Sequence, residues 1–356
     1  MLVLLFSGFL LFGPKSVDLV PVHKLSAIPE DADNFLQNPW DATVSPAGKV
    51  YILDLAEATV FHWDESGKFL GNFAKRGQGP GDLMISSRIG GPQASIATRG
   101  EELVVYDGGL RKINRFKSDG TFVSAVNFNL ARGRTESFRP LNNGNYLIHH
   151  RSFGGESSAP TVNVGIFKED GTEVKELFTM PDTSWKPRKD GERGIVMIGY
   201  SRDVFVHYDA DADRIIIADT DKPVAQVFDQ EGKLQTTVQM KLPRPEVSAE
   251  DIAEYREIGW LKNNNWVKLD FPEKHQLFQY IMPDKKNGYM VFRESPVYCN
   301  LVGVYVDSNG KTTGRVNLAL GEESRIFAAR GKFLIIRANE DGDFNVYIAE
   351  PKPQTT

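Results

Sequence analysis

Short apolar runs alternate with polar turns along most of the chain, and one order of runs recurs. The first copy consists of Lys49–Asp54, Thr59–Trp63, a polar turn at Glu65–Lys68, and Phe69–Phe73. The second copy repeats this order within Glu102–Val126. Runs of β-branched and aromatic residues separated by X-Gly turns predict strands joined by hairpins.

Further copies of this pattern begin at Asn145, Arg214, Gly288 and Lys332. An additional strand precedes each copy, which gives four strands per unit and six units. Four-stranded sheets repeated radially form a β-propeller. The sequence therefore predicts an all-β, six-bladed propeller as a single domain over residues 17–350, followed by a tail at 351–356. The turn glycines of the first five copies are Gly67, Gly120, Gly171, Gly232 and Gly310.

The sixth unit ends before its fourth strand, whereas an unassigned strand-like run, Val17–Leu25, lies near the N-terminus. We predict that this run supplies the missing strand and closes the ring, because closure removes an exposed sheet edge. Pro21 fits an outermost strand, where one side needs no ladder hydrogen bond.

The apolar run Leu2–Phe12 is too short for a membrane-spanning helix, which needs about 20 residues. Its length is typical of a signal-peptide core, although no Lys or Arg precedes it and no small-x-small site follows. We interpret residues 1–16 as a signal peptide or hydrophobic leader and expect a periplasmic or secreted bacterial protein. A buried strand is the alternative. We expect no other contact with a membrane.

Composition narrows the function classes. The chain is 41% hydrophobic and 25% charged, and 42 basic against 47 acidic residues give a net charge of -5. This balance argues against a nucleic-acid-binding face, which is normally basic. The lone Cys299 excludes an intrachain disulfide and a cysteine-based zinc site.

The chain resembles the NHL-like and bacterial six-bladed β-propeller families. The segment Lys75–Leu83, with the sequence KRGQGPGDL, is similar to the G-x-G-P-G-(D/E) linker that these families place between their first two blades. The strand endings Tyr51–Asp54 and Ile216–Asp219 resemble the NHL V-x-D element. This resemblance implies the fold but not one activity, since such propellers include binding scaffolds, lyases and lactonases.

A candidate site follows from the predicted topology. In a propeller, the ends of all second strands gather on one face, so we predict a central mouth there. Each aspartate of this ring could instead cap its own turn. The two arginines indicate either an anionic ligand or salt bridges to the aspartates. The ring consists of Asp54, Asp107, His150, Asp219, Arg293 and Arg337, with Arg76 at its rim.

Two long insertions, at about 181–203 and 243–274, leave from the same predicted face. The second contains a helical pattern between blades four and five that begins with the capping-box-like Ser248–Asp251. Trp260 and Trp266 follow the helix and are candidate ligand contacts. Packing of the insertion onto the propeller is an equally good interpretation of these aromatic residues.

The sequence contains no metal-binding or nucleophile-elbow motif, and we predict no metal or cofactor. Our leading hypothesis is a non-enzymatic binding propeller that recognises a small-molecule or peptide-like ligand at the mouth. The alternatives are a hydrolase or lyase acting at the same mouth, and a scaffold for protein–protein interaction. Catalytic residues remain unassigned.

Overall fold

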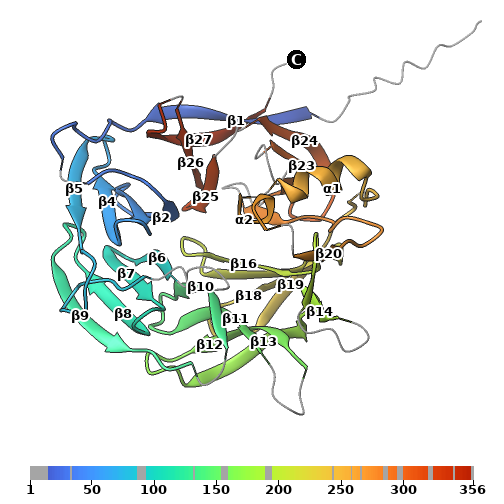
Figure 1. The fold of residues 1–356 in the computed structure, drawn as a ribbon, viewed down its shortest axis with the longest axis horizontal. Helices are drawn as coiled ribbons and strands as arrows, with labels where there is room; N and C mark the ends of the chain where they lie inside the picture. The colour runs from blue at the N-terminus through green and yellow to red at the C-terminus, as the bar shows by residue number, and fades with distance from the viewer. Residues whose placement is uncertain are drawn as a thin grey trace, which may run out of the picture.

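The computed structural model describes residues 15–32, 34–85, 94–130, 133–153, 159–188, 195–242, 244–257, 259–264, 267–283, 288–294, 300–319, 324–339 and 341–353. Within them, the chain forms antiparallel sheets of mostly four strands arranged around a central axis (Figure 1). In the four-stranded sheets, strands adjacent in sequence are hydrogen-bonded neighbours, and the first strand lies innermost.

Four sheets repeat this order along the chain. The first contains β2 (Pro39–Val44), β3 (Val50–Asp54), β4 (Thr59–Trp63) and β5 (Phe69–Phe73). The second contains β6 (Ala94–Arg99), β7 (Glu102–Asp107), β8 (Lys112–Phe116) and β9 (Phe122–Asn127). The third contains β10 (Arg134–Pro140), β11 (Tyr146–Ser152), β12 (Thr161–Phe167) and β13 (Glu173–Pro181). The fourth contains β16 (Val204–Asp209), β17 (Arg214–Asp219), β18 (Val224–Phe228) and β19 (Leu234–Gln239).

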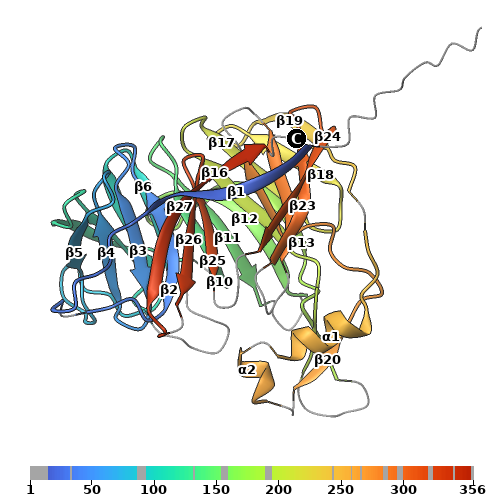
Figure 2. The ribbon, with the colours of Figure 1, turned by 90° about the horizontal axis from the view of Figure 1, so that it is seen from above.

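The remaining propeller strands form one eight-stranded sheet, in which the N-terminal strand joins two sets of four. The fifth set is β21 (Tyr280–Pro283), β22 (Tyr289–Glu294), β23 (Asn300–Val306) and β24 (Thr312–Ala319). The sixth is β25 (Arg325–Ala329), β26 (Lys332–Ala338), β27 (Phe344–Pro353) and β1 (Lys15–Lys24). The N-terminal segment thus supplies the outer strand of the last set, as the sequence predicted, and Figure 2 shows it crossing toward β24.

The strand pairing extends slightly beyond the predicted domain limits. β1 is antiparallel to β27 and also pairs in parallel with β24, with Lys15 opposite Gly314. Val17 lies opposite Pro353. Two residues of the predicted leader and three of the predicted tail therefore belong to strands, because their backbone completes these ladders.

Apolar side chains fill the spaces between neighbouring sheets. Six buried clusters occur among the described residues, one at each junction around the ring. One of them joins Val50 and Ile52 of the first sheet to Leu334 and Ile336 of the last. The middle strand β3 is buried throughout, whereas the outer strand β19 is mostly exposed. The ring is therefore closed by hydrophobic packing as well as by strand pairing.

The recurrent turn glycines let each sheet dock closely against the preceding one. Gly120 has φ +85°, and a Cβ atom there would lie 2.5 Å from the ring of Phe73 in the outer strand of the first sheet. Gly310 has φ +81°, and its Cβ would lie 1.7 Å from the carbonyl oxygen of Gln239. The repeat requires glycine for both backbone conformation and space.

The two predicted insertions fold together into one small module. β14 (Trp185–Pro187) pairs antiparallel with β15 (Ile195–Ile198), which pairs in parallel with β20 (Lys268–Asp270) from the second insertion. The second insertion also forms α1 (Ala249–Arg256) and α2 (Gly259–Lys262). The N-cap Ser248 and Asp251 make a reciprocal capping box at the start of α1. Figure 2 shows the module projecting from one face of the ring. No helix in the described ranges is long and apolar enough to cross a membrane.

Candidate functional site

Two aspartates of the predicted ring are buried hydrogen-bond acceptors for backbone turns. Asp54 has no exposed surface and accepts bonds of 2.7–3.0 Å from the backbone N–H groups of residues 37, 38, 56 and 57. Asp107, equally buried, accepts from the N–H groups of residues 84, 109 and 110. These carboxylates occupy the capping role that the sequence analysis gave as the alternative to ligand binding.

Asp219 and Arg76 are also engaged within the protein. Asp219 forms an ion pair with Arg202 and a 3.3 Å ion pair with Lys222. Burial acts to raise the pKa of Asp219, but hydrogen bonds from Arg202 and a backbone N–H outweigh it and lower the pKa. Arg76 donates to the carbonyl oxygens of Leu55 and Ala56, so its guanidinium braces the turn that follows β3.

The remaining ring candidates differ in their surroundings. His150 is partly buried, its ring packs edge-on against Phe167 at 5.8 Å between centroids, and burial lowers its pKa. Arg337 lies in β26 with an exposed side chain. The side chains of Arg293 and Trp260, and the whole of Trp266, lie outside the described residues. The mouth predicted from these positions therefore stays a prediction.

An arginine that the sequence analysis did not identify anchors the first insertion. Arg151, next to His150, is largely buried and forms ion pairs of 3.1, 2.8 and 2.7 Å with Glu136, Asp182 and Asp203. Asp182 and Asp203 stand at the two ends of the insertion. Burial raises the pKa of Asp203 despite the opposing charge of Arg151. The sequence indicated the bounds of the insertion, at about 181 and 203, but not that aspartates at its two ends share Arg151 as a partner.

Three aromatic side chains of the insertion module pack against one another and against His275. Tyr200 has φ +51°, and its ring contacts Tyr255, Phe271 and His275 at 4.4–6.0 Å between centroids. His275 Nε2 lies 3.1 Å from Oδ2 of Asp251, the residue that caps α1. These contacts tie the second insertion to the chain between β15 and β16, which supports the packing interpretation for these particular residues.

The inner strands line the central axis and carry an ion pair that joins three sheets. Asp41 of β2 pairs with Arg139 of β10 through contacts of 2.8 and 3.3 Å. It also accepts the backbone N–H of Ile96 from β6 at 3.0 Å. A space of about 170 Å³ lies beside this pair, lined by residues from all six innermost strands.

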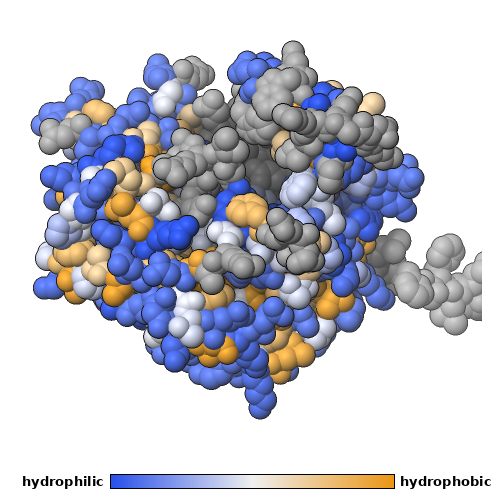
Figure 3. Space-filling model, turned by 60° about the horizontal axis from the view of Figure 1, so that its bottom comes forward, coloured by the Kyte–Doolittle hydropathy of each residue, from blue (hydrophilic) through white to orange (hydrophobic). Residues whose placement is uncertain are grey.

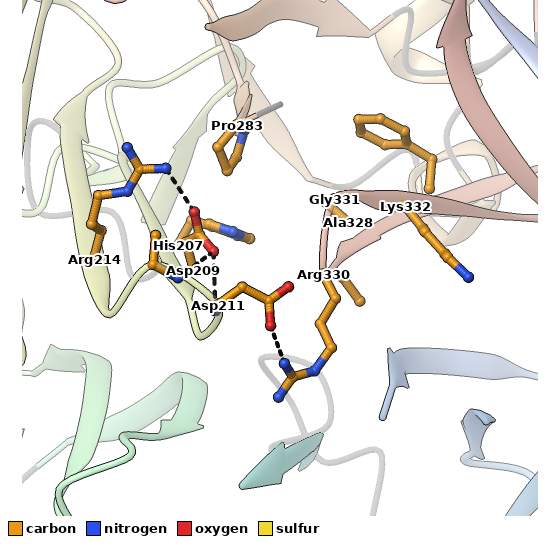
Figure 4. A pocket seen from close by; sticks show the side chains of 12 residues that line it. His207, Asp209, Asp211, Arg214, Pro283, Ala328, Arg330, Gly331 and Lys332 are labelled. Carbon is orange, nitrogen blue, oxygen red and sulfur yellow. Dashed lines mark hydrogen bonds and ion pairs between the residues drawn. The ribbon is translucent and has the colours of Figure 1, made fainter. Parts of the chain in front are cut away.

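A larger cavity of about 310 Å³ opens near the axis, and we call it the axial cavity (Figure 4). The turn between β16 and β17 forms one wall, the turn between β25 and β26 forms the other, and Pro283 of β21 lies between them. It shares four lining residues with the smaller space. The axial cavity is lined by His207, Asp209, Asp211, Ala212, Arg214, Pro283, Ala328, Ala329, Arg330, Gly331, Lys332 and Phe333.

Two ion pairs dominate the axial cavity. Arg214 lies 2.8 Å from Asp209 on the same hairpin. Arg330 reaches across from the last sheet and pairs with Asp211 of the fourth, and Figure 4 shows these side chains pointing toward one another. The side chain of Arg330 is 14% exposed, whereas that of Asp211 is 54% exposed. Burial lowers the pKa of the adjacent His207 to about 4, so its imidazole is neutral at pH 7.

The axial cavity and the predicted ring lie at opposite ends of the strands. Arg214 begins β17 and Asp219 ends it, a separation of about 16 Å at 3.3 Å per residue. None of the nine predicted site residues is among the described residues that line either space. Figure 3 shows one face of the molecule, on which hydrophilic side chains predominate among the described residues. Within the described ranges, no three His, Cys, Asp or Glu side chains form a group that could hold a metal ion.

Comparisons with known proteins agree on the fold. The DUF5128 family model, described as "6-bladed beta-propeller", matches residues 33–185. The sequence has no match among curated proteins. A DUF4221 family member from Bacteroides vulgatus ATCC 8482 has a similar structure, with TM-score 0.58, 12% identity, and coverage of 96% of this chain and 100% of that one.

A second similar structure is that of a "Putative exported protein (BF0058)" from Bacteroides fragilis NCTC 9343. Its TM-score is 0.54 and its identity 11%, with coverage of 95% of this chain and 96% of that one. Identities this low concern the fold and carry no activity across. The resemblance expected from the repeats is confirmed, and the chain is an all-β protein similar to the six-bladed β-propellers.

Proposed function

We propose that this protein is an exported, non-enzymatic six-bladed propeller that binds a small polar ligand in the axial cavity. The cavity itself is the observation that carries this proposal. Its volume of about 310 Å³ falls at the lower end of the range for small-molecule sites, which combine a concave shape with a few convergent polar groups.

The distribution of charge supports ligand binding in the axial cavity. It argues against binding at the predicted ring of second-strand ends, which we call the strand-end ring. Each buried aspartate of the ring accepts hydrogen bonds from several backbone N–H groups. If a ligand displaced the carboxylate, these N–H groups would lose their acceptor and the turns would be destabilised. In the axial cavity, Asp209 also accepts backbone N–H groups of its turn, but Asp211 and Arg330 are paired with each other through their side chains. Side chains can change partners without unfolding a turn, so these groups are available to a ligand.

Export is the second part of the proposal. It rests on the apolar run Leu2–Phe12 and on the likeness to a protein described as exported. Cell fractionation tests it by comparing cells that express the full chain with cells that express a chain lacking residues 1–14. The full chain should leave the cytoplasm and the shortened chain should stay there. If both remain in the cytoplasm, export is wrong.

Binding is tested by thermal shift and calorimetry of the purified protein against a set of small polar metabolites. Ala212 lines the cavity from an exposed turn, so Ala212→Trp should fill the space while leaving the sheets intact. Ligands of the axial cavity should stabilise the natural protein and lose this effect in the variant. If no compound binds, or if every bound compound is unaffected by Ala212→Trp, this site is wrong.

A hydrolase or lyase acting at the same cavity is the second candidate function. His207 is the observation behind it, because histidine is the commonest general acid or base and this one lines the cavity. Turnover of any bound compound, followed by mass spectrometry and lost in His207→Gln, would identify an enzyme. Binding without turnover supports the non-enzymatic proposal.

A further inference from the structure

The axial cavity holds an arginine whose position is unusual for its backbone conformation. Arg330 and Gly331 form the two-residue turn between β25 and β26, since Ala329 and Lys332 are directly paired. Both turn residues have positive φ, +50° and +63°. Such turns favour Asn, Asp or Gly at the first position, and a left-handed backbone is unfavourable for arginine.

This turn places the guanidinium inside the cavity with few partners. The only hydrogen bond of the Arg330 side chain among the described residues runs from Nη1 to Asp211, and its buried Nε has none. Asp211 is more than half exposed, so its carboxylate would be well hydrated if the pair opened. Arg330 would stay at the cavity wall. The pair is therefore suited to exchange, with a ligand anion replacing Asp211.

The charges of the lining indicate the class of anion. Two arginines, Arg214 and Arg330, pair with two carboxylates, Asp209 and Asp211, and Figure 4 shows the side chain of Lys332 directed away from them. A single ligand carboxylate that replaces Asp211 keeps this balance of charge, and it fits the planar fork of a guanidinium, which binds carboxylates through two parallel hydrogen bonds. A phosphate dianion would be repelled by the two aspartates.

We propose that Arg330 is the specificity-determining residue of the axial cavity and that it binds the carboxylate group of a small ligand in exchange for Asp211. This inference rests on the proposed function, because it names the ligand class of the same site. It differs from the site predicted from the sequence, because it assigns ligand recognition to a residue of a strained turn and not to the arginines of the strand-end ring.

The test measures binding of the monocarboxylates acetate, propionate, lactate and succinamate by calorimetry, with succinamide and inorganic phosphate as comparison compounds. At least one carboxylate should bind, and it should bind more tightly than succinamide or phosphate. Arg330→Gln should weaken binding about tenfold to a hundredfold, as expected for loss of charge-assisted hydrogen bonds. Asp211→Asn should tighten it about twofold to fivefold, because Arg330 is released from a partly exposed pair.

Arg99 provides a matched control. It flanks the equivalent two-residue turn between β6 and β7 but is not among the residues that line either space. Arg99→Gln removes the same charge and should leave the affinity unchanged. The far-ultraviolet circular dichroism spectrum and melting temperature of each variant show that it is folded.

The outcomes separate the two proposals. If a neutral or cationic compound binds, is blocked by Ala212→Trp, and is unaffected by Arg330→Gln, the binding cavity stands and the carboxylate assignment is wrong. Phosphate binding more tightly than every carboxylate also overturns the assignment. If none of the carboxylates binds the natural protein, Arg330 is not a carboxylate site, whatever the metabolite set shows about the cavity.

Discussion

The strand-end ring and the axial cavity use the same kinds of charged residue in opposite ways. At the ring, Asp54 is buried and its four partners are backbone N–H groups within about twenty residues. At the cavity, Asp211 is mostly exposed and its partner is Arg330, 119 residues away. One arrangement holds a local turn, and the other joins two sheets through side chains alone.

This difference separates carboxylates that hold the fold from carboxylates that can exchange their partner. A carboxylate that accepts several backbone bonds cannot leave them without exposing unpaired donors. A partly exposed ion pair contributes little stability and can be exchanged at low cost. Repeated aspartates therefore indicate architecture, and the charge that departs from the repeat is the better guide to function.

Loss of the Asp54 carboxylate should give the largest effect. Asp54→Ala leaves four backbone N–H groups without their acceptor in a buried site, so we expect about 3–5 kcal/mol of destabilisation. Urea unfolding monitored by circular dichroism measures it. Asp211→Ala is the control and should cost about 1 kcal/mol or less.

A stable Asp54→Ala protein that fails to bind ligand would break the comparison, because the ring would then be the site. A loss of stability in Asp211→Ala as large as that in Asp54→Ala would also contradict the comparison, because the axial pair would then be needed to hold the fold.

Acidification should destabilise the protein through two histidines, one near the strand-end ring and one at the axial cavity. Burial lowers the pKa of both His149 and His207 from 6.5 to about 4. The unfolded chain therefore binds these protons at higher pH than the folded chain does. Each histidine contributes stability that is complete above pH 6.5 and is lost as the pH falls toward 4.

The two histidines can be separated by substitution. His149→Gln and His207→Gln should each flatten the fall in urea midpoint between pH 6.5 and 4. Only His207 lines the axial cavity, so only His207→Gln should change the pH dependence of ligand binding. A pH profile identical to that of the natural protein in both variants would contradict the assigned burial effects.

Local pattern predicted most of the fold. Strand positions and turn glycines follow from spacing, since hairpins are determined by nearby residues. The N-terminal closing strand followed from the strand count, because the last unit lacked one strand and an unassigned run remained at the N-terminus. Capping by Asp54 was also visible as an alternative, because its donors lie close in sequence. The Asp211–Arg330 pair was not, because it requires the fourth and sixth sheets to be placed around the axis. Pairing of β15 with β20 could not be predicted either, because it also depends on how the two insertions are placed around the ring.

Replacing the strained arginine should separate stability from binding. A left-handed backbone costs an L-residue about 1–2 kcal/mol, whereas glycine adopts it freely. Arg330→Gly loses a weak ion pair but removes this cost, so we expect stability to rise by about 0.5–1 kcal/mol while carboxylate binding is lost. Arg330→Gln keeps the strain and should not gain stability. A fall in the stability of Arg330→Gly would show that the arginine is retained for packing rather than for a ligand.

The smallest effect is expected at Arg337, the described arginine of the predicted ring. Its side chain is exposed, and it forms no ion pair with the described residues. Arg337→Ala should change stability by less than about 0.5 kcal/mol, as is usual for such surface positions. Arg337 belongs to the end of β26 remote from the cavity, while Lys332 begins the strand at the cavity wall. Calorimetry with the tightest-binding carboxylate should therefore give the natural affinity. A tenfold loss in this variant, together with unchanged binding in Arg330→Gln, would move the ligand to the strand-end ring and give the axial pair a structural role.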